Sequence, residues 1–169
     1  IGYRALRANI SSDSNVALGG RAGENLNGGA RNVFVGYVAG QSNVTSSDCI
    51  AIGFMALAAG SHDQYGTVAI GRESLKTVST GLGNTGIGYF AGRFIDTGYN
   101  NTMCGFLSGS VMTVGHDNTL FGHQSGLGIT NGFNNTIIGS LTAPLLADGY
   151  NNIIIGTNTA SVMTNAYNN

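Results

Sequence analysis

Charged residues, proline, cysteine and tryptophan are all scarce in this chain. Charged side chains make up 9% of the 169 residues, and there are one proline, two cysteines and no tryptophan. An ordinary globular domain contains about 25% charged residues. The formal net charge of −1 indicates neither a nucleic-acid nor a membrane partner. No apolar run approaches the roughly 20 residues that cross a bilayer, and no signal-peptide pattern is present.

Glycine is abundant instead, and one glycine recurs every 17 residues from end to end. Eight of the nine gaps are 17 residues long, and the gap from Gly53 to Gly71 is 18. A fixed period of this length predicts a solenoid, which is a stack of similar coils. We expect residues 1–169 to be a single repeat array. The chain opens and stops within a coil and has no atypical polar caps, so we also expect an excerpt of a longer fibre. The glycines are Gly2, Gly19, Gly36, Gly53, Gly71, Gly88, Gly105, Gly122, Gly139 and Gly156.

Numbering each coil so that this glycine is position 5 aligns the other residues into columns. Position 1 is asparagine in eight of ten coils, position 2 is Val, Ile or Thr, position 4 is apolar and position 8 is small. Side-chain amides stacked about 4.8 Å apart can hydrogen-bond along the stack. We therefore expect the asparagine column to be a structural ladder. Its members are Asn15, Asn32, Asn84, Asn101, Asn118, Asn135, Asn152 and Asn169.

The columns predict two short strands in each coil. Positions 1–4 are rich in β-branched residues, as in residues 135–138, and end at the glycine. Positions 10–14 carry an apolar residue at position 12 in seven coils, and Gly at 15 with Asn or Asp at 17 then turns the chain back. A 3.6-residue period is absent, which argues against helix. We predict an all-β fold, a parallel β-solenoid (β-roll) of ten 17-residue coils.

Position 3 leads to a prediction about assembly. If positions 2 and 4 point into the core of a lone coil, position 3 faces water, yet it is apolar or glycine in every coil. A strand that is apolar on both faces is buried on both faces, and monomers rarely expose so long an apolar column. We therefore expect parallel copies to cover position 3 around a shared axis, as a homotrimer. The column is Ala17, Phe34, Ala51, Ala69, Gly86, Met103, Leu120, Ile137 and Ile154.

One string in the chain resembles known fibre repeats. Residues 84–92 read Asn-Thr-Gly-Ile-Gly-Tyr-Phe-Ala-Gly, and the string is similar to repeats of phage tail fibres and of trimeric autotransporter adhesin heads. The resemblance covers all ten coils. It implies parallel β-rolls, left-handed in the adhesin heads, with three chains around one axis that act as rigid extracellular shafts or adhesive heads. The adhesin heads have a shorter period, and their charged neck and coiled-coil stalk are not present here.

Patterns typical of enzymes and metal sites fit poorly. Residues 87–92 match the hexapeptide of left-handed β-helix acyltransferases, but those enzymes need three hexads per coil and a catalytic histidine on a protruding loop. Only one hexad per coil matches here. Calcium β-rolls need aspartates in register, whereas those of this chain fall mainly in different columns, and no carboxylate pair is spaced for glycoside hydrolysis. We expect no catalytic, metal or cofactor site, and the acyltransferase stays an open alternative.

Two binding functions are also left open. Thr85, Thr102, Thr119 and Thr136 form a threonine column at position 2, as an ice-binding solenoid requires. Against ice binding, position 2 is expected to point inward, and no second threonine column accompanies it. Aromatic side chains in the turns, most of them at position 16, can stack on the sugars of a cell-surface glycan. The candidate contacts are His62, Tyr65, Tyr99, Phe133, Tyr150 and Tyr167.

The predicted function is structural and adhesive. We expect a shaft or head segment of an extracellular trimeric fibre, on a virion tail or a cell surface, that attaches to a host or surface. Its main partner is a further copy of itself. A specific contact is most readily placed where the repeat is broken, at the 18-residue coil 49–66, at Pro144 or along the aromatic turn column.

Overall fold

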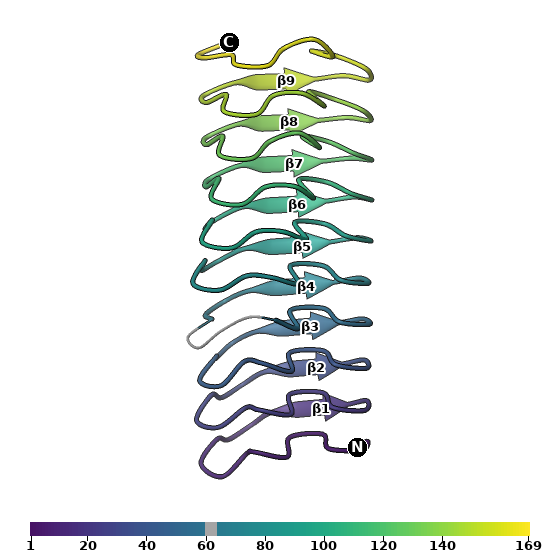
Figure 1. Ribbon diagram of the computed structural model, residues 1–169, viewed down its shortest axis with the longest axis vertical. Helices are drawn as coiled ribbons and strands as arrows, with labels where there is room; N and C mark the ends of the chain where they lie inside the picture. The colour runs from purple at the N-terminus through teal and green to yellow at the C-terminus, as the bar shows by residue number, and fades with distance from the viewer. Residues whose placement is uncertain (60–63) are drawn as a thin grey trace.

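The computed structural model describes residues 1–59 and 64–169, and these form a β-solenoid with the termini at opposite ends of the stack (Figure 1). Nine strands of three residues each pair in parallel in the order of the sequence. Neighbouring strands are in register, so that Thr119 pairs with Thr102 on one side and with Thr136 on the other. The predicted all-β parallel solenoid is confirmed. The strands are β1 (Val16–Leu18), β2 (Val33–Val35), β3 (Ile50–Ile52), β4 (Val68–Ile70), β5 (Thr85–Ile87), β6 (Thr102–Cys104), β7 (Thr119–Phe121), β8 (Thr136–Ile138) and β9 (Ile153–Ile155).

Each coil holds one strand, so the prediction of two strands per coil is wrong. Positions 10–14 do hydrogen-bond to the next coil, as Asn25 N does to the carbonyl of Gln41 (3.1 Å), but they lie in turns. The reason is that turns follow the left-handed residues found at positions 7 and 9 of every repeat. The backbone N of Arg93 donates to the carbonyl of Phe90 (φ 58°) at 3.3 Å, and that of Ile95 donates to the carbonyl of Gly92 (φ 57°) at 3.1 Å. A left-handed residue ends the extended conformation that a strand requires. Nine strands form rather than ten because only Ile1 precedes the first glycine.

The side chains of each strand point in the opposite directions to those we predicted. Position 3 points into the core of its own coil, where Met103, Leu120 and Ile137 have no exposed surface. Positions 2 and 4 face outward and are partly or fully exposed. The cause is the asparagine at position 1, whose side chain is buried inside the stack. Side chains two residues apart in an extended chain share a face, so position 3 points inward as well. Position 3 is therefore covered by its own chain and gives no reason to expect a trimer.

Three columns from different sides of the coil fill the core, as Leu120 at position 3, Ser125 at position 8 and Ile129 at position 12 do in one coil. Position 9 compensates for the size of position 3. A glycine stands at position 9 beside a large residue, as at Gly126, where an added Cβ would lie 2.9 Å from Leu120. The reverse arrangement occurs where Leu75 occupies position 9 and the neighbouring position 3 is Gly86. A Cβ added to Gly86 would lie 2.8 Å from the Leu75 side chain. The core is thus closely packed along the stack although its residues differ.

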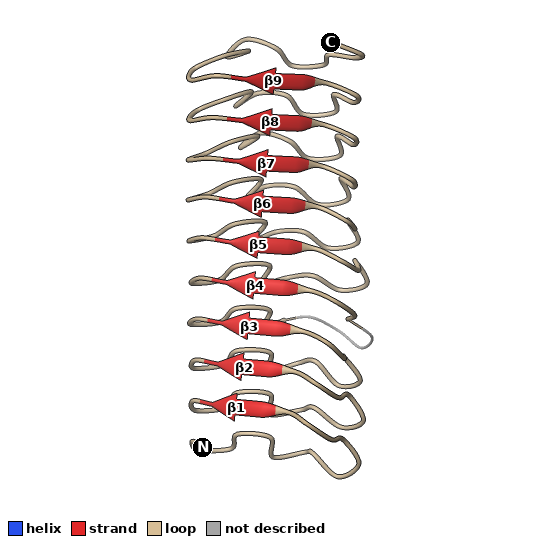
Figure 2. Ribbon diagram, turned by 180° about the vertical axis from the view of Figure 1, so that it is seen from behind, coloured by secondary structure: helices blue, strands red, loops and turns tan. Residues whose placement is uncertain are grey.

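The stack has two broad faces joined by two edges. The strands line one face, which we call the sheet face (Figure 2). Its surface consists of the outward side chains at positions 2 and 4. The turns and loops line the opposite side, which we call the loop face and which is toward the viewer in Figure 1. The described residues include no helix, and so none of the length and hydropathy needed to cross a membrane.

Candidate interaction surfaces

The sheet face carries an apolar side chain at position 4 of every strand. This column is partly or fully exposed from end to end, with Leu18 at 48%, Phe121 at 55% and Ile155 at 64%. The position 2 column is Val or Ile at both ends of the stack, with threonines between. A continuous apolar strip of this kind marks an interaction surface in soluble proteins. The two columns that we expected inside the coil are therefore the ones available to a partner.

Four threonines of position 2 also face outward. Thr102 and Thr119 are exposed, and Thr85 and Thr136 are partly exposed. They pair in register on four neighbouring strands, which places the side chains about 4.8 Å apart. The expectation that position 2 points inward, which we held against ice binding, is therefore wrong. The column beside them at position 4 reads Ile, Cys, Phe and Ile, so the threonines stand next to apolar side chains.

The asparagine column forms a hydrogen-bonded ladder inside the coil. In the repeated pattern, Asn118 Nδ2 donates to Asn101 Oδ1 (3.0 Å) and to the carbonyl of Gly132 (2.8 Å). Asn118 Oδ1 accepts from the backbone N (3.1 Å) and from Nδ2 (2.9 Å) of Asn135. Each amide thus closes its own coil and joins the coils on both sides. The linked members are Asn15 with Asn32, and Asn84 with Asn101, Asn118, Asn135, Asn152 and Asn169.

Cys49 and Thr67 interrupt the ladder at the 18-residue coil, and Gln64 takes the place of the missing amide. The backbone N of Cys49 still donates to Asn32 Oδ1 (3.0 Å). Gln64 is fully buried. Its Nε2 donates to the carbonyl of Ser79 (2.7 Å), and its Oε1 accepts from the hydroxyl of Thr67 (3.3 Å). At this coil, Gln64 and Thr67 therefore make hydrogen bonds in place of the asparagine amide, and the stack continues past the interruption.

The glycine column at position 5 is required by the close stacking of the coils. Its φ values lie between 127° and 139° in all ten glycines. An added Cβ at Gly88 would lie 2.5 Å from the carbonyl oxygen of Gly105 in the next coil. This backbone conformation is accessible in practice only to glycine, and the distance leaves no room for a side chain. The column is therefore structural and offers nothing to a ligand.

Aromatic residues at position 16 form a continuous stack along one edge, which we call the aromatic edge. Successive ring centroids are 4.7, 5.0, 4.9 and 4.6 Å apart. His116 and Phe133 are stacked on both faces, whereas the last pair, Tyr150 and Tyr167, is tilted by 34°. A sugar can therefore contact only the ring edges of His116 and Phe133. The structure thus weakens the expected sugar stacking along this edge. The members are Tyr99, His116, Phe133, Tyr150 and Tyr167.

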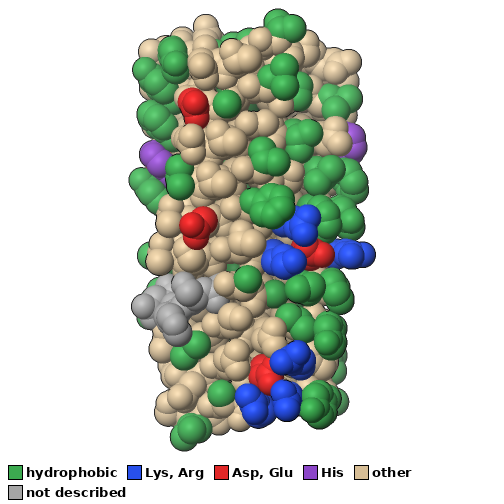
Figure 3. Space-filling view, viewed as in Figure 1, with side chains coloured by type: hydrophobic (Ala, Val, Ile, Leu, Met, Phe, Trp, Pro, Cys, Tyr) green, Lys and Arg blue, Asp and Glu red, His purple; other side chains and the backbone are tan. Residues whose placement is uncertain are grey.

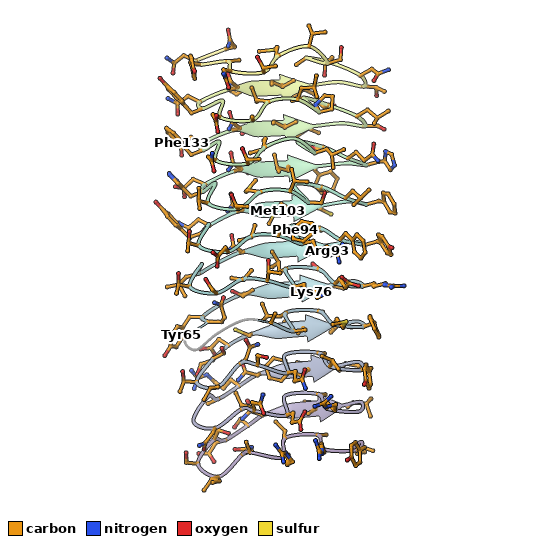
Figure 4. All side chains as sticks on the ribbon, in the orientation of Figure 1. Tyr65, Lys76, Arg93, Phe94, Met103 and Phe133 are labelled. Atoms are coloured by element: carbon orange, nitrogen blue, oxygen red, sulfur yellow. The ribbon has the colours of Figure 1, made fainter. Side chains whose placement is uncertain are left out.

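The two remaining candidate contacts lie apart from this stack. Tyr65 is half exposed and forms a parallel bridge with Ser47, on the same edge as Phe133 (Figure 4). His62 lies outside the described residues. The structure therefore brings four of the six candidate residues together.

A second aromatic column occupies position 6, and we did not identify it from the sequence. The rings of Tyr37 and Phe54 are stacked 5.9 Å apart, and those of Tyr89 and Phe106 are stacked 5.2 Å apart. Arg72 stands between these pairs, with its guanidinium carbon 5.3 Å from the centroid of Phe54 and 5.9 Å from that of Tyr89. The signal was present in the sequence, because these aromatic residues recur at the coil spacing.

Two clusters of charged residues form blue and red groups on the loop face in Figure 3. In the first, Glu24 is almost fully buried and is contacted by Arg4 (3.4 Å), Arg7 (3.3 Å) and Arg21 (2.7 Å). Gln41 donates a further hydrogen bond to it (2.8 Å). The hydrogen bonds from Gln41 and Arg21 lower the pKa of Glu24, so the carboxylate is charged at neutral pH. Three cations around one anion give this cluster a net positive charge.

The second cluster surrounds Glu73, three coils further along. The contacts of its carboxylate are with Arg93 (2.7 Å), Lys76 (3.1 Å) and Arg72 (3.7 Å). Burial alone raises the pKa of Glu73, but the hydrogen bond from Lys76 and the nearby cations lower it overall. The guanidinium of Arg93 also lies over the half-exposed ring of Phe94, 4.8 Å from its centroid (Figure 4). This cluster is again three cations around one anion.

Groups able to act in catalysis are not gathered at one place in the described part of the chain. No set of three His, Cys, Asp or Glu side chains there could hold a metal ion. Cys49 is buried, and burial raises the pKa of its thiol to about 11, while Cys104 is partly exposed on the sheet face. His116 Nδ1 lies 2.9 Å from Asp117, and this hydrogen bond lowers the pKa of the Asp117 carboxyl. The candidate sites are therefore extended surfaces.

Comparisons with protein-family models, with curated proteins and with solved structures gave no match to this chain. Its function is therefore inferred from the surfaces of the solenoid.

Proposed function

We propose that this chain is a shaft or adhesive head segment of an extracellular trimeric fibre, either a phage tail fibre or a bacterial surface adhesin, that attaches to a host or surface. Three parallel copies pack sheet face against sheet face around a common axis. The chain does no chemistry of its own, and its main partner is a further copy of itself.

The observation that carries this proposal is the outward apolar strip of the sheet face. Eight strand spacings of about 4.8 Å and three residues of about 3.3 Å make a strip of about 38 by 10 Å. At about 25 cal/mol per Å² of apolar surface, burying it contributes at most about 10 kcal/mol for each chain, because the four threonines are part of this area. Association costs about 4–15 kcal/mol in lost freedom of motion. The balance is close, so we expect one charged side chain in the strip to prevent assembly.

The regular stack supports a role as a rigid shaft. The asparagine ladder and the glycine column tie each coil to the coils on either side, so the structure can extend by repetition. The path of the chain supports the left-handed coil that the resemblance implies. In Figure 1 the chain rises from the N-terminus at the bottom to the C-terminus at the top. It runs from left to right along the strands at the back and from right to left along the loops at the front, which is the path of a left-handed coil (Figures 1 and 2).

Sedimentation equilibrium tests the proposal. The unmodified chain is expected to have three times the mass of one 17.3 kDa chain. Phe121→Lys puts a charge on the sheet face and is expected to yield a monomer. Leu145→Lys is the matched control, because Leu145 is exposed to a similar extent but lies outside the sheet face. A stable unmodified monomer, or a Phe121→Lys protein that still forms trimers, would contradict the proposal.

Ice binding is a second candidate, which the outward threonine column favours. The four threonines lie at regular spacing on a parallel sheet, where their hydroxyls can meet ordered water. This function needs an uncovered sheet face, so it and a sheet-face trimer exclude each other. Thermal hysteresis by a monomeric chain, lost in Thr119→Lys, would favour ice binding and rule out the trimer. Absence of thermal hysteresis would remove this candidate.

A further inference from the structure

Positive charge is concentrated on one side of the coil. All Lys and Arg residues except Arg31 lie at positions 6, 7 or 10, and they form the clusters around Glu24 and Glu73. The described aspartates lie at positions 13–17, and Arg31 pairs with one of them, Asp48 (2.6 Å). Figure 3 shows the two blue clusters on one side and isolated red side chains on the other. The chain therefore has a basic surface although its net charge is −1.

Each cluster holds more cations than its carboxylate can neutralise. A carboxylate offers about four acceptor positions, and Glu24 is already contacted by three arginines and Gln41. Arg7 contacts Glu24 through Nε (3.3 Å). Cations held around one anion repel one another. An additional anion on the outside of the cluster would relieve that repulsion.

The cations are held in position and are open to solvent. The side chains of Arg7 and Arg72 are 57% and 55% exposed. Their partners Glu24 and Glu73 are almost fully buried, so each carboxylate anchors its guanidinium groups from below. Arg72 is further fixed between two aromatic rings. Arginines ordered before binding lose little freedom when they meet a ligand, which favours tight contact with carboxylate or sulfate groups.

The spacing of the clusters indicates the class of ligand. Glu24 and Glu73 are three coils apart, which corresponds to about 14 Å along the stack, and the coils between them carry Val38 and Met55 at position 7. A nucleic acid presents closely spaced phosphates and is bound by a continuous row of cations. A linear polymer with widely spaced anionic groups fits this surface better. The exposed ring of Phe94 beside the second cluster also suits the apolar face of a sugar.

We propose that the two clusters together form a binding site for an acidic polysaccharide, a sugar polymer with carboxylate or sulfate groups that lies along the stack axis. The site extends across the coils from Arg4 to Arg93. It does not depend on the proposed trimer, because the strands of the sheet face contain none of its residues.

Calorimetric titration of the full chain tests this site, with hyaluronan as the carboxylated probe and neutral dextran as the uncharged one. We expect binding of hyaluronan but not of dextran, with affinity falling about fivefold or more between 20 and 200 mM NaCl because salt screens exposed charges. The double variant Arg7→Gln/Arg72→Gln is expected to lower the hyaluronan affinity about tenfold or more. Arg31→Gln is the matched control, since Arg31 is an exposed arginine outside the clusters, and a change below about twofold is expected.

Three results would overturn the proposal: no hyaluronan binding at 20 mM NaCl, an equal loss in Arg31→Gln, or tighter binding of double-stranded DNA than of hyaluronan. Thermal unfolding confirms that each variant is folded. If the double variant does not fold, Arg7→Gln alone is measured, and it is expected to lose about threefold in affinity. An unchanged affinity in that folded variant would also overturn the proposal.

Discussion

Replacing one asparagine in the middle of the ladder should destabilise the solenoid far more than replacing an exposed one. Asn118→Ala removes two donated hydrogen bonds, to Asn101 and to Gly132, and two accepted ones, both from Asn135. All four are buried. At about 1 kcal/mol for each bond, we expect a loss of about 4 kcal/mol, because water cannot easily replace the missing amide.

This loss corresponds to a fall in melting temperature of about 8–16 °C, since 1 kcal/mol shifts the midpoint by about 2–4 °C in a chain of this size. Urea and thermal unfolding measure it. Hydrogen exchange adds a local test, because the backbone N–H of Asn135 loses its acceptor and should exchange faster.

The control is Asn131→Ala, which removes an exposed side chain whose Nδ2 bonds Asp148 (2.8 Å). We expect it to cost less than about 0.5 kcal/mol. Equal destabilisation by Asn118→Ala and Asn131→Ala would refute the reasoning that the buried ladder stabilises the stack.

Three further predictions follow from the glycine column, the buried thiol and the first charged cluster. Gly88→Ala is expected to cost about 3 kcal/mol or more, because φ is 133° and the new Cβ would meet a carbonyl oxygen at 2.5 Å. Gly66→Ala should cost only about 1 kcal/mol, because φ is 63° with nothing within 4 Å, and chemical denaturation that finds the two equal would contradict this account. In a Cys104→Ser variant, which lacks the partly exposed second thiol, Cys49, whose thiol pKa is raised to about 11 by burial, should react with maleimide at pH 7 only after unfolding, and rapid labelling of that native variant would show that the core is open. The pKa of Glu24 is lowered, so its contribution to stability is present above its ordinary pKa of about 4.3 and is lost as the pH falls through the lower folded value. Melting temperatures from pH 7 to 2.5 should therefore fall less in Glu24→Gln than in the unmodified chain, and parallel curves would be the contrary result.

The coil length and the stacked ladder were open to prediction because each column repeats one chemical requirement. A glycine at every position 5 signals a conformation that other residues avoid, and a column of amides signals hydrogen bonds along the stack. The direction of the strand residues was harder to predict, because positions 2, 3 and 4 are all apolar or threonine and alternation gives no contrast. The buried Asn118 was the missing clue, since it fixes Leu120 on the same inner face.

The second strand was mispredicted because the left-handed residues at position 7 have no common sequence signal. Val38 (φ 63°) and Leu141 (φ 52°) adopt this conformation although neither residue type favours it. The surface clusters could be predicted only in part. Recurring aromatic residues at position 6 were visible in the columns, whereas the contact of Arg4 with Glu24 joins different columns of neighbouring coils and needs coordinates.

Cross-linking at Cys104 tests the central claim most directly, because this thiol lies in the middle of the sheet face on β6. In a parallel trimer packed through that face, the Cys104 thiols of different chains lie close to the common axis. A short bismaleimide should then join Cys104 of one chain to Cys104 of another, and Cys104→Ser should give no covalent product. A native chain whose Cys104 is labelled at the rate of a free thiol, without any covalent dimer, would contradict the trimer.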